Sequence, residues 1–331
     1  MLNRKVLNVI VQPIAIMISI VLVGFSSIAF AQAKFPDAPI KIIVPFAPGG
    51  GVDSAARLIG RQLQTNLGVI VIVENRAGAN GSIGGKFVQS AAADGLTLLF
   101  SASTHALAKQ VMATAPYDPM TDFAHVARVG EAPLMMVIAP NLPQTKLKEV
   151  VDAARANPDK WTAGLPALGA ASHLGTLMLA SQGNIKLATA VYKGTSPALT
   201  DVAGGHTQIL IDSIISLQGM AKSGKVKPIM VTSAQRSSVM PNVPTAVESG
   251  FPKLVTESWY GIWAPKGTPE DRLQMLNRAV NDATRQVSKS GAFEQLGLEP
   301  VTESIADFKK YMSSYITENA DLLKSAGFKP E

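Results

Sequence analysis

Three turns rich in glycine and small hydroxyl residues carry the chemistry that this sequence could perform. The first lies in PFAPGGGVDSAARL (45–58), where a strand ends and Asp53 or Ser54 is predicted to cap the helix that follows. The glycines from Gly49 to Gly51 let the backbone turn tightly. Because N–H groups at a helix start are unpaired and the helix dipole favours negative charge, such a turn is typical of an anion site. As a cap, Asp53 would hold the loop rather than touch the ligand.

Two later turns follow the same pattern. In GAASHLG (169–175), Ser172 is predicted to cap a helix and to offer an oxygen or an N–H group toward a cleft. In VYKGTSPALTD (191–201), a strand end is followed by Thr195 and Ser196, which open a helix. Ligands of open α/β sheets bind outside the carboxyl ends of the strands, so the three turns are expected to face one cleft. The side chains expected to complete its polar lining, each of which alone is equally typical of a turn, are Ser101, Ser103, Thr104 and Asp212.

The sequence predicts no catalytic residue, no metal site and no cofactor. Ser172 and His173 are adjacent, so they would not face each other at a helix start, and His173 is expected to be a structural residue at the cleft edge. The turn at Gly49 and Gly51 resembles a dinucleotide-binding loop, but Ser54 stands where its third glycine belongs. The chain has no cysteine, and its four histidines are scattered without the spacing of metal ligands.

The elements that must position these turns belong to an α/β protein. Apolar runs of strand length, such as 40–46 and 69–73, alternate with helical patterns, which is typical of a mostly parallel sheet covered by helices. A second block of the same alternation, from 134 to 211, predicts a second lobe. Helices are expected to start at Ser196-Pro197 and at Thr268-Pro269, with the hydroxyl residue as the cap and proline as the first helical residue.

Composition limits the class of protein. With 331 residues, 47% of them hydrophobic and 16% charged, the chain can bury a large core, and its length suits two domains. The formal net charge of +6 is mild, and basic residues cluster no further than pairs such as Lys309-Lys310. Nucleic-acid binding proteins concentrate Lys and Arg on one face, so nucleic acid is not an expected partner.

The first 33 residues are predicted to be a secretory signal. Arg4 and Lys5 precede an apolar stretch, and small residues then offer cleavage after Ala31 or Ala33. This pattern predicts a mature protein in the periplasm. The competing interpretation is an uncleaved membrane anchor, which Pro13 disfavours because it interrupts the apolar stretch.

From Phe35 to the C-terminus the sequence resembles the Bug receptors, which are the substrate-binding proteins of tripartite tricarboxylate transporters. The order and spacing of seven segments make the resemblance specific: FPDAPIKIIVPFAPGGGVDSAARL, VIVENRAGANGSIGG, ADGLTLLFSAS, PYDPMTDFAHVARVG, ASHLG, VYKGTSPALTD and WYGIWAPKGTP. The sequence departs from the family at Ala77, where proline is common, and in LPALGAASHLG, which is unusually apolar. The second departure leaves fewer hydrogen-bond donors for the far end of the ligand, so it bears on which substrate is bound.

The resemblance implies a two-lobed periplasmic binding protein of the Venus-flytrap kind, type II-like. Its first lobe would comprise residues 34–134 and 258–331, its second lobe residues 135–257, and its hinge two crossings near Pro133 and Ser258. In this family a ligand carboxylate is held by backbone amides, small hydroxyl groups and ordered waters rather than by arginine. By position, this role falls to Phe46, Ala47, Gly49, Gly50, Gly51, Ser101, Ser103, Ala171, Ser172, Gly194, Thr195 and Ser196.

The function expected from these observations is reversible capture of a small mono- or dicarboxylate by a monomeric receptor that is not an enzyme. The receptor would deliver its ligand to the membrane subunits of a tripartite tricarboxylate transporter. One alternative keeps the binding module but has it report to a membrane sensor kinase. A second alternative, an exported α/β enzyme, would be recognised by nicotinamide binding or by turnover of an ester.

Overall fold

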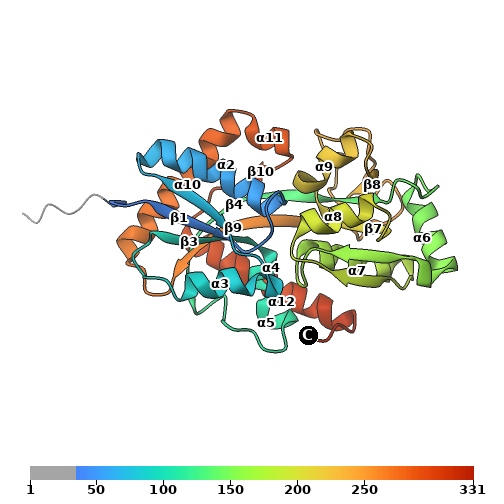
Figure 1. The fold of residues 1–331 in the computed structure, drawn as a ribbon, viewed down its shortest axis with the longest axis horizontal. Helices are drawn as coiled ribbons and strands as arrows, with labels where there is room; N and C mark the ends of the chain where they lie inside the picture. The colour runs from blue at the N-terminus through green and yellow to red at the C-terminus, as the bar shows by residue number, and fades with distance from the viewer. Residues whose placement is uncertain (1–34) are drawn as a thin grey trace, which may run out of the picture. The chain divides into compact units, whose positions relative to one another are not determined.

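The computed structural model describes residues 35–331, of which residues 38–331 form one compact unit. The predicted signal segment, with its cleavage sites, lies outside the described residues. Ten strands of this unit are joined by hydrogen bonds: eight follow the order β2-β1-β3-β9-β4-β7-β5-β6, and β10 and β8 both pair with β4 (Figure 1). The strands are β1 (Ile40–Val44), β2 (Val71–Asn75), β3 (Thr97–Ala102), β4 (Phe123–Ile138), β5 (Thr162–Leu165), β6 (Ala188–Val191), β7 (Ile209–Ser213), β8 (Lys227–Val231), β9 (Glu257–Pro265) and β10 (Glu299–Pro300).

Helices connect and cover these strands. In chain order the α-helices are α2 (Gly51–Leu67), α3 (Ser82–Gln89), α4 (Ser103–Ala106), α5 (Ala108–Val111), α6 (Leu147–Ala156), α7 (Ala171–Gly183), α8 (Thr195–Ala203), α9 (Ile214–Lys222), α10 (Glu270–Lys289), α11 (Ala292–Leu296) and α12 (Ile305–Ser325), and the short 3-10 helices are η1 (Ala79–Gly81) and η2 (Pro158–Lys160). None of the helices described between residues 35 and 331 has the length and apolar character of a membrane span.

The expected α/β class is confirmed, but the prediction of a mostly parallel sheet is wrong at the centre. Strands β1, β2 and β3 pair in parallel, as do β5, β6 and β7. Every pair made by β4 or β9 is antiparallel. The sequence pattern predicts only the second part of β4, from Leu134, and does not predict β8.

Strand β4 joins two groups of strands, as Figure 1 shows. Its first part pairs with β9, and its last part, Leu134–Ile138, pairs with β7 and β8. We call β1, β2, β3, β9, β10 and the first part of β4 the first strand group, and β5 to β8 with the last part of β4 the second. The chain passes between the groups along two paired strands, since Ala132 lies opposite Ser258 and Pro133 opposite Glu257.

Each strand group has its own apolar core. In the first, Ile43 and Leu99 pack with Trp259, Trp263 and Phe308. In the second, strand residues of β4, β5 and β7 pack against α6 and α7, with Leu134, Met136, Ala163, Ile209, Ile211, Val150 and Leu179 at the centre. Burial of these side chains removes apolar surface from water, and this stabilises each strand group separately.

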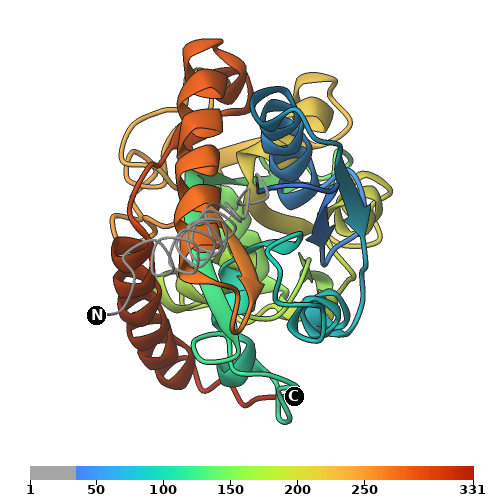
Figure 2. The same cartoon turned by 90° about the vertical axis from the view of Figure 1, so that its left-hand side faces the viewer.

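The C-terminal helix α12 contacts both groups. Phe308 and Met312, in its first half, belong to the core of the first group. Leu323, near its end, packs against Leu174 of α7 in the second group. The last residue then returns beside α5, where Glu331 N–H donates to the Val111 carbonyl over 3.1 Å (Figure 2).

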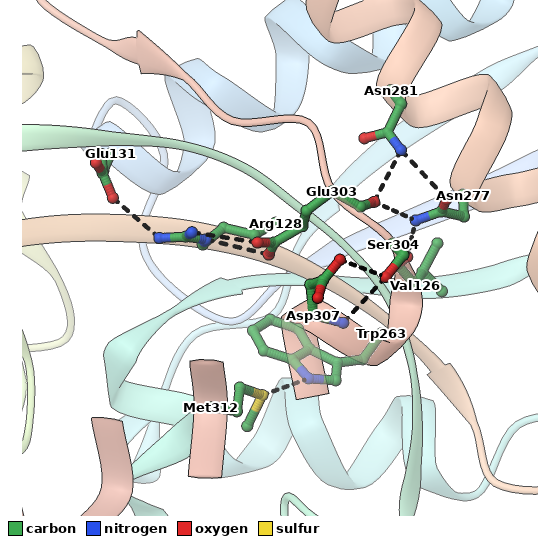
Figure 3. A network of polar contacts seen from close by, with 10 residues as sticks. All are labelled: Val126, Arg128, Glu131, Trp263, Asn277, Asn281, Glu303, Ser304, Asp307 and Met312. Atoms are coloured by element: carbon green, nitrogen blue, oxygen red, sulfur yellow. Dashed lines mark hydrogen bonds and ion pairs between the residues drawn. The ribbon is translucent and has the colours of Figure 1, made fainter. Parts of the chain in front are cut away.

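Polar contacts fix the start of α12 and the first part of β4 (Figure 3). Arg128 on β4 donates two hydrogen bonds to the Glu303 carboxylate, both 3.2 Å long, and a third to Glu131. Its guanidinium also lies 3.7 Å above the centre of the Tyr311 ring. Ser304, as expected for a helix cap, accepts a hydrogen bond from the Asp307 N–H.

Replacing Glu303 by alanine is expected to lower the free energy of unfolding by about 2 to 3 kcal/mol, because it leaves a largely buried guanidinium short of its partner. Both side chains of the pair are only 13% exposed. Chemical denaturation measures the change. Lys148→Ala, which breaks an ion pair whose lysine is 78% exposed, is the matched control and should cost less than about 1 kcal/mol. Equal effects of the two substitutions would contradict this account.

Candidate functional site

A cavity lies where the two strand groups face each other, and the space free of protein atoms within and at the mouth of it is about 480 Å³. It is lined by Phe46, Ala47, Gly50, Gly51, Val52, Asp53, Ala102, Ser103, Thr104, Pro166, Ala167, Ala170, Ala171, Gly194, Thr195, Asp212, Ser213, Ser216, Ser258 and Tyr260.

Four helices of nine residues or more begin at this cavity. The residues that precede α2, α7, α8 and α9 are Gly50, Ala170, Gly194 and Ser213, and all four line the cavity. Within the described chain, no side chain at these four positions caps its helix. The first N–H groups of each helix therefore remain available to a ligand, and the four helix dipoles add a positive potential.

Two hydrogen bonds join the glycine turn of the first group to the third turn, in the second group. Ala47 N–H donates to the Lys193 carbonyl over 3.1 Å, and Ser196 Oγ donates to the Pro48 carbonyl over 2.9 Å. Gly194 has φ +128°, and a Cβ there would lie 3.2 Å from the Ala47 nitrogen. Glycine is required at this position both by the backbone conformation and by the close approach of the two turns.

The prediction that Asp53 caps α2 is wrong, because the helix begins earlier, at Gly51. The Asp53 carboxylate instead accepts hydrogen bonds from Gly49 N–H at 3.0 Å, from Asn75 Nδ2 at 2.9 Å and from Arg57 Nε at 3.0 Å. Burial alone would raise the pKa of Asp53, but these hydrogen bonds hold it below its ordinary value. Asp53 therefore stabilises the turn as an ionised group, which is the supporting role expected of it.

Two other predicted helix starts are also wrong. Helix α8 begins at Thr195 rather than after Ser196, since the Ser196 hydroxyl is bonded to Pro48 in the other strand group. Helix α10 begins at Glu270, after Pro269, and the Thr268 hydroxyl donates to the Pro265 carbonyl. In both cases a tertiary or turn contact uses the hydroxyl that the local pattern assigns to a cap. Ser172 likewise does not cap α7, which Ala170 precedes.

Hydroxyl groups supply the remaining polar atoms of the cavity. Tyr260 Oη donates to Ser213 Oγ over 2.9 Å, and burial raises the pKa of Tyr260 to about 12, so the phenol stays neutral. Ser216 Oγ is buried and has no hydrogen-bond partner among the described residues. A buried hydroxyl of this kind at a cavity wall is a donor available to a ligand.

The charge in the cavity comes from carboxylates. Among the described residues that line it, none is Lys, Arg or His. Asp212 is buried, and its carboxylate accepts a 2.5 Å hydrogen bond from Thr195 Oγ1. Burial raises the pKa of Asp212 to about 6, although the hydrogen bonds from Thr195 and from the Ser213 main chain oppose this shift. The cavity thus offers neutral donors together with one acid that ionises near neutral pH.

Most of the predicted site residues lie in the cavity lining, and five do not. Those in the lining are Phe46, Ala47, Gly50, Gly51, Asp53, Ser103, Thr104, Ala171, Gly194, Thr195 and Asp212, and those outside it are Gly49, Ser101, Ser172, His173 and Ser196. Ser101 Oγ and Ser172 Oγ are buried without a partner in the described chain. A role in binding remains a prediction for all of these residues.

Sequence reasoning missed part of the lining. Ser258 and Tyr260 come from β9, Ser213 is the last residue of β7, and Ser216 lies in the first turn of α9. No local pattern marks the two residues of β9, because Tyr260 reaches the cavity only through the antiparallel pairing of β9 with β3 and β4. Serines at the end of β7 and just after it were the one signal that could have located Ser213 and Ser216.

His173 has a structural environment. Its Nδ1 accepts a hydrogen bond from Gly169 N–H over 3.1 Å, and its ring packs edge-on against Phe328. Burial lowers the pKa of His173 to about 4, so the ring is neutral at pH 7. Among residues 35–331, no group of His, Cys, Asp and Glu side chains has an arrangement suited to a metal ion.

Comparison with known families identifies the chain. Residues 55–328 match the family model described as "Tripartite tricarboxylate transporter family receptor". The chain belongs to this receptor family. Family members are solute-binding receptors and not enzymes, in agreement with the sequence prediction.

Solved structures show the same fold as the receptor. The periplasmic binding protein BugD superposes with a TM-score of 0.85 at 31% identity, covering 90% of this chain and 100% of that one. Rpa4515 of R. palustris with adipate gives a TM-score of 0.87 at 30% identity, with coverage of 90% and 100%. MatC from Rhodopseudomonas palustris with bound malate gives 0.82 at 30% identity, with coverage of 87% and 100%. The expected periplasmic binding protein fold and the resemblance to Bug receptors are therefore confirmed.

Proposed function

We propose that this receptor binds a small organic mono- or dicarboxylate in its cavity and delivers it to the membrane subunits of a tripartite tricarboxylate transporter. The observation that carries the proposal is the meeting of four uncapped helix starts at one cavity. Helix starts hold carboxylates through N–H groups and the dipole, without a formal positive charge. The adipate and malate named for two similar structures are ligands of this chemical class.

The donors around the cavity are suited to a ligand that must be released. Backbone N–H groups and hydroxyls, rather than an ion pair, would bind the carboxylate, so it can leave without separation of two buried charges. The apolar surfaces of Phe46, Ala102, Pro166 and Ala167 would cover the carbon chain between the polar ends. A short carboxylate with an apolar middle fits this arrangement of polar donors and apolar side chains.

Capture would involve closure of two lobes around the ligand. We place the lobes at residues 34–134 with 258–331 and at residues 135–257, so that the hinge coincides with the crossing near Pro133 and Ser258. Support comes from the pairing of β4 with β9, which puts both crossings side by side. A hinge needs only a few residues that change conformation together, and two adjacent strands meet that requirement. The receptor would act as a monomer in the periplasm after cleavage of its signal.

Titration calorimetry with a panel of acids tests the proposed ligand class. Adipate, malate, succinate and acetate would be compared with the neutral diamide of adipic acid. We expect at least one acid to bind, and the diamide to bind about 10- to 100-fold more weakly than adipate, since each carboxylate accepts charge-assisted hydrogen bonds. Binding of a sugar or a cation, with no acid bound, would refute the proposal. Uptake of the bound acid by cells that carry the membrane subunits then distinguishes transport from sensing.

A further inference from the structure

One side chain of the first strand group makes two hydrogen bonds to the main chain of the second. Asn80, in η1 between β2 and α3, donates from Nδ2 to the Leu168 carbonyl over 3.0 Å. Its Oδ1 accepts the Leu168 N–H over 2.7 Å. The amide of Asn80 thus pairs with one whole peptide residue in the way that a neighbouring strand would, which fixes both position and orientation.

Asn80 makes this contact from an unfavourable backbone conformation. Its φ is +54° and its ψ is +34°, in the left-handed region, between two glycines, Gly78 and Gly81, that also have positive φ. Glycine would adopt this conformation at lower cost, and asparagine is one of the few other residues that tolerate it. A side chain other than glycine at such a position is expected to have a use beyond the turn itself.

Leu168 belongs to a segment that forms one wall of the cavity. Pro166, Ala167 and Ala170 line the cavity on either side of it. The Leu168 side chain packs against the apolar cluster of Leu107 and Val111 in the first group and Leu174 in the second. The wall is therefore attached to the first strand group by its main chain and by its apolar side chain.

Gly169, which follows Leu168, also lies close to the first strand group. Gly169 has φ +70°, and a Cβ there would lie 3.1 Å from both Leu107 Cβ and Val111 Cγ1. These residues bring the second group into direct contact with the first. The wall segment is thus shaped to fit against the first group, and Asn80 supplies its polar contact.

We propose that Asn80 is a positioning residue that holds the wall segment 166–170 against the first strand group and so stabilises the closed, ligand-retaining form. This inference rests on the proposed closure of two lobes around a ligand. It does not depend on which acid is bound, because Asn80 is not itself part of the cavity lining. Its effect should appear in the closed fraction and in the lifetime of the complex, not in the choice of ligand.

Asn80→Gly is the informative substitution, because it removes both hydrogen bonds and suits the backbone conformation. Asn184→Gly is the matched control: Asn184 also has a positive φ, of 46°, but ends α7 at the surface, away from the cavity. The chain has no cysteine, so Arg61→Cys on α2 and Lys148→Cys on α6 would carry a pair of spin labels at exposed positions, one on each group.

Pulsed electron spin resonance then measures the distance between the labels with and without saturating adipate. We expect Asn80→Gly to shift the population toward the longer distance by about tenfold relative to the parent, and Asn184→Gly to leave it unchanged. Stopped-flow release of adipate should be about tenfold faster in Asn80→Gly, and the Leu168 amide should exchange its hydrogen faster. Asn80→Asp, which keeps the acceptor but not the donor, should also release adipate faster than the parent.

The outcomes separate this inference from the proposed ligand class. A parental distance distribution, parental amide exchange and parental release in Asn80→Gly would refute the role of Asn80, whatever acid binds. If no acid binds to the parent but the distance distribution of Asn80→Gly shifts, the ligand class is wrong and the role of Asn80 is supported. Equal shifts in Asn80→Gly and Asn184→Gly would assign the effect to the backbone and would also refute it.

Discussion

Asp212→Asn is expected to strengthen the binding of adipate at pH 8 by about 10- to 100-fold. At that pH Asp212, with a pKa of about 6, is ionised in the empty cavity. Two like charges about 5 to 8 Å apart in a partly buried site repel by roughly 2 to 3 kcal/mol, and the asparagine amide removes this repulsion. The substitution keeps the size of the side chain and an oxygen that can accept the Thr195 hydroxyl hydrogen.

The same reasoning predicts proton uptake on binding. A dianionic ligand raises the pKa of Asp212 further, so the parent should take up as much as one proton per adipate near pH 7, whereas Asp212→Asn should take up none. Calorimetry in two buffers of different ionisation enthalpy measures the number. Asp159→Asn, at an exposed position, is the control and should behave as the parent. Weaker binding of adipate by Asp212→Asn at pH 8 would contradict the prediction and would indicate that Asp212 accepts a hydrogen bond from the ligand.

Asp212 should also make the stability of the empty receptor depend on pH. Asp212 is harder to ionise when folded than when unfolded, so between about pH 4 and pH 6 the folded state binds more protons. Its contribution to stability therefore decreases as the pH rises through that window. A shift of about two pKa units corresponds to an upper limit of about 3 kcal/mol, and Asp212→Asn should recover part of it as a higher Tm at pH 7.

Gly51→Ala is expected to weaken ligand binding by about 10- to 100-fold. A Cβ at Gly51 would lie 2.8 Å from Tyr260 Oη, closer than such atoms approach in folded proteins, and 3.0 Å from Ser216 Oγ, which is tighter than most such contacts. Tyr260 is buried and bonded to Ser213, so it can yield only by moving within the cavity that it lines. Separation of α2 from α9 would relieve the contact with Ser216, but it would also move apart two of the helix starts that surround the cavity. Overpacking of this kind costs about 1 to 3 kcal/mol.

Affinity for adipate by calorimetry, together with the Tm of the empty protein, measures this effect. Gly219→Ala is the matched control, because a Cβ at Gly219, inside α9, meets no atom within 4 Å. It should leave affinity unchanged and raise stability by up to about 1 kcal/mol, as expected for alanine in a helix. Parental affinity and Tm in Gly51→Ala would show that the two helix starts do not meet as closely as the structure indicates.

Much of the site could be predicted from the sequence because its parts are local. A strand end, a glycine turn and a helix start follow one another within a few residues at 45–58 and at 191–201, and glycine and hydroxyl residues mark them directly. The rule that ligands bind beyond the carboxyl ends of strands then predicted that these turns would meet. Eleven of the predicted residues, including Gly50, Thr195 and Asp212, do lie in one cavity lining.

The errors have one physical cause, which is competition from distant partners. Local pattern assigned Ser196 and Asp53 to helix caps, but Ser196 bonds Pro48, 148 residues away, and Asp53 bonds Asn75. The antiparallel centre was missed because β9 pairs with β4 from 124 or more positions further along the chain, the nearest pair being Pro133 with Glu257. Secondary-structure propensity and hydrophobic periodicity depend on residues close together in sequence, so they carry no information about contacts between distant segments.

The sequence by itself determined the α/β class and the uncharged donor turns, and it led to the prediction of an anionic ligand, because each depends on residue types within a short segment. Only the tertiary structure decided that Tyr260 lines the cavity, that Asp212 is buried without a cation beside it and that Asn80 forms hydrogen bonds with Leu168, 88 residues away. Those features arise from the pairing of β4 with β9 and from the approach of two strand groups, and they depend on distances that no single segment fixes.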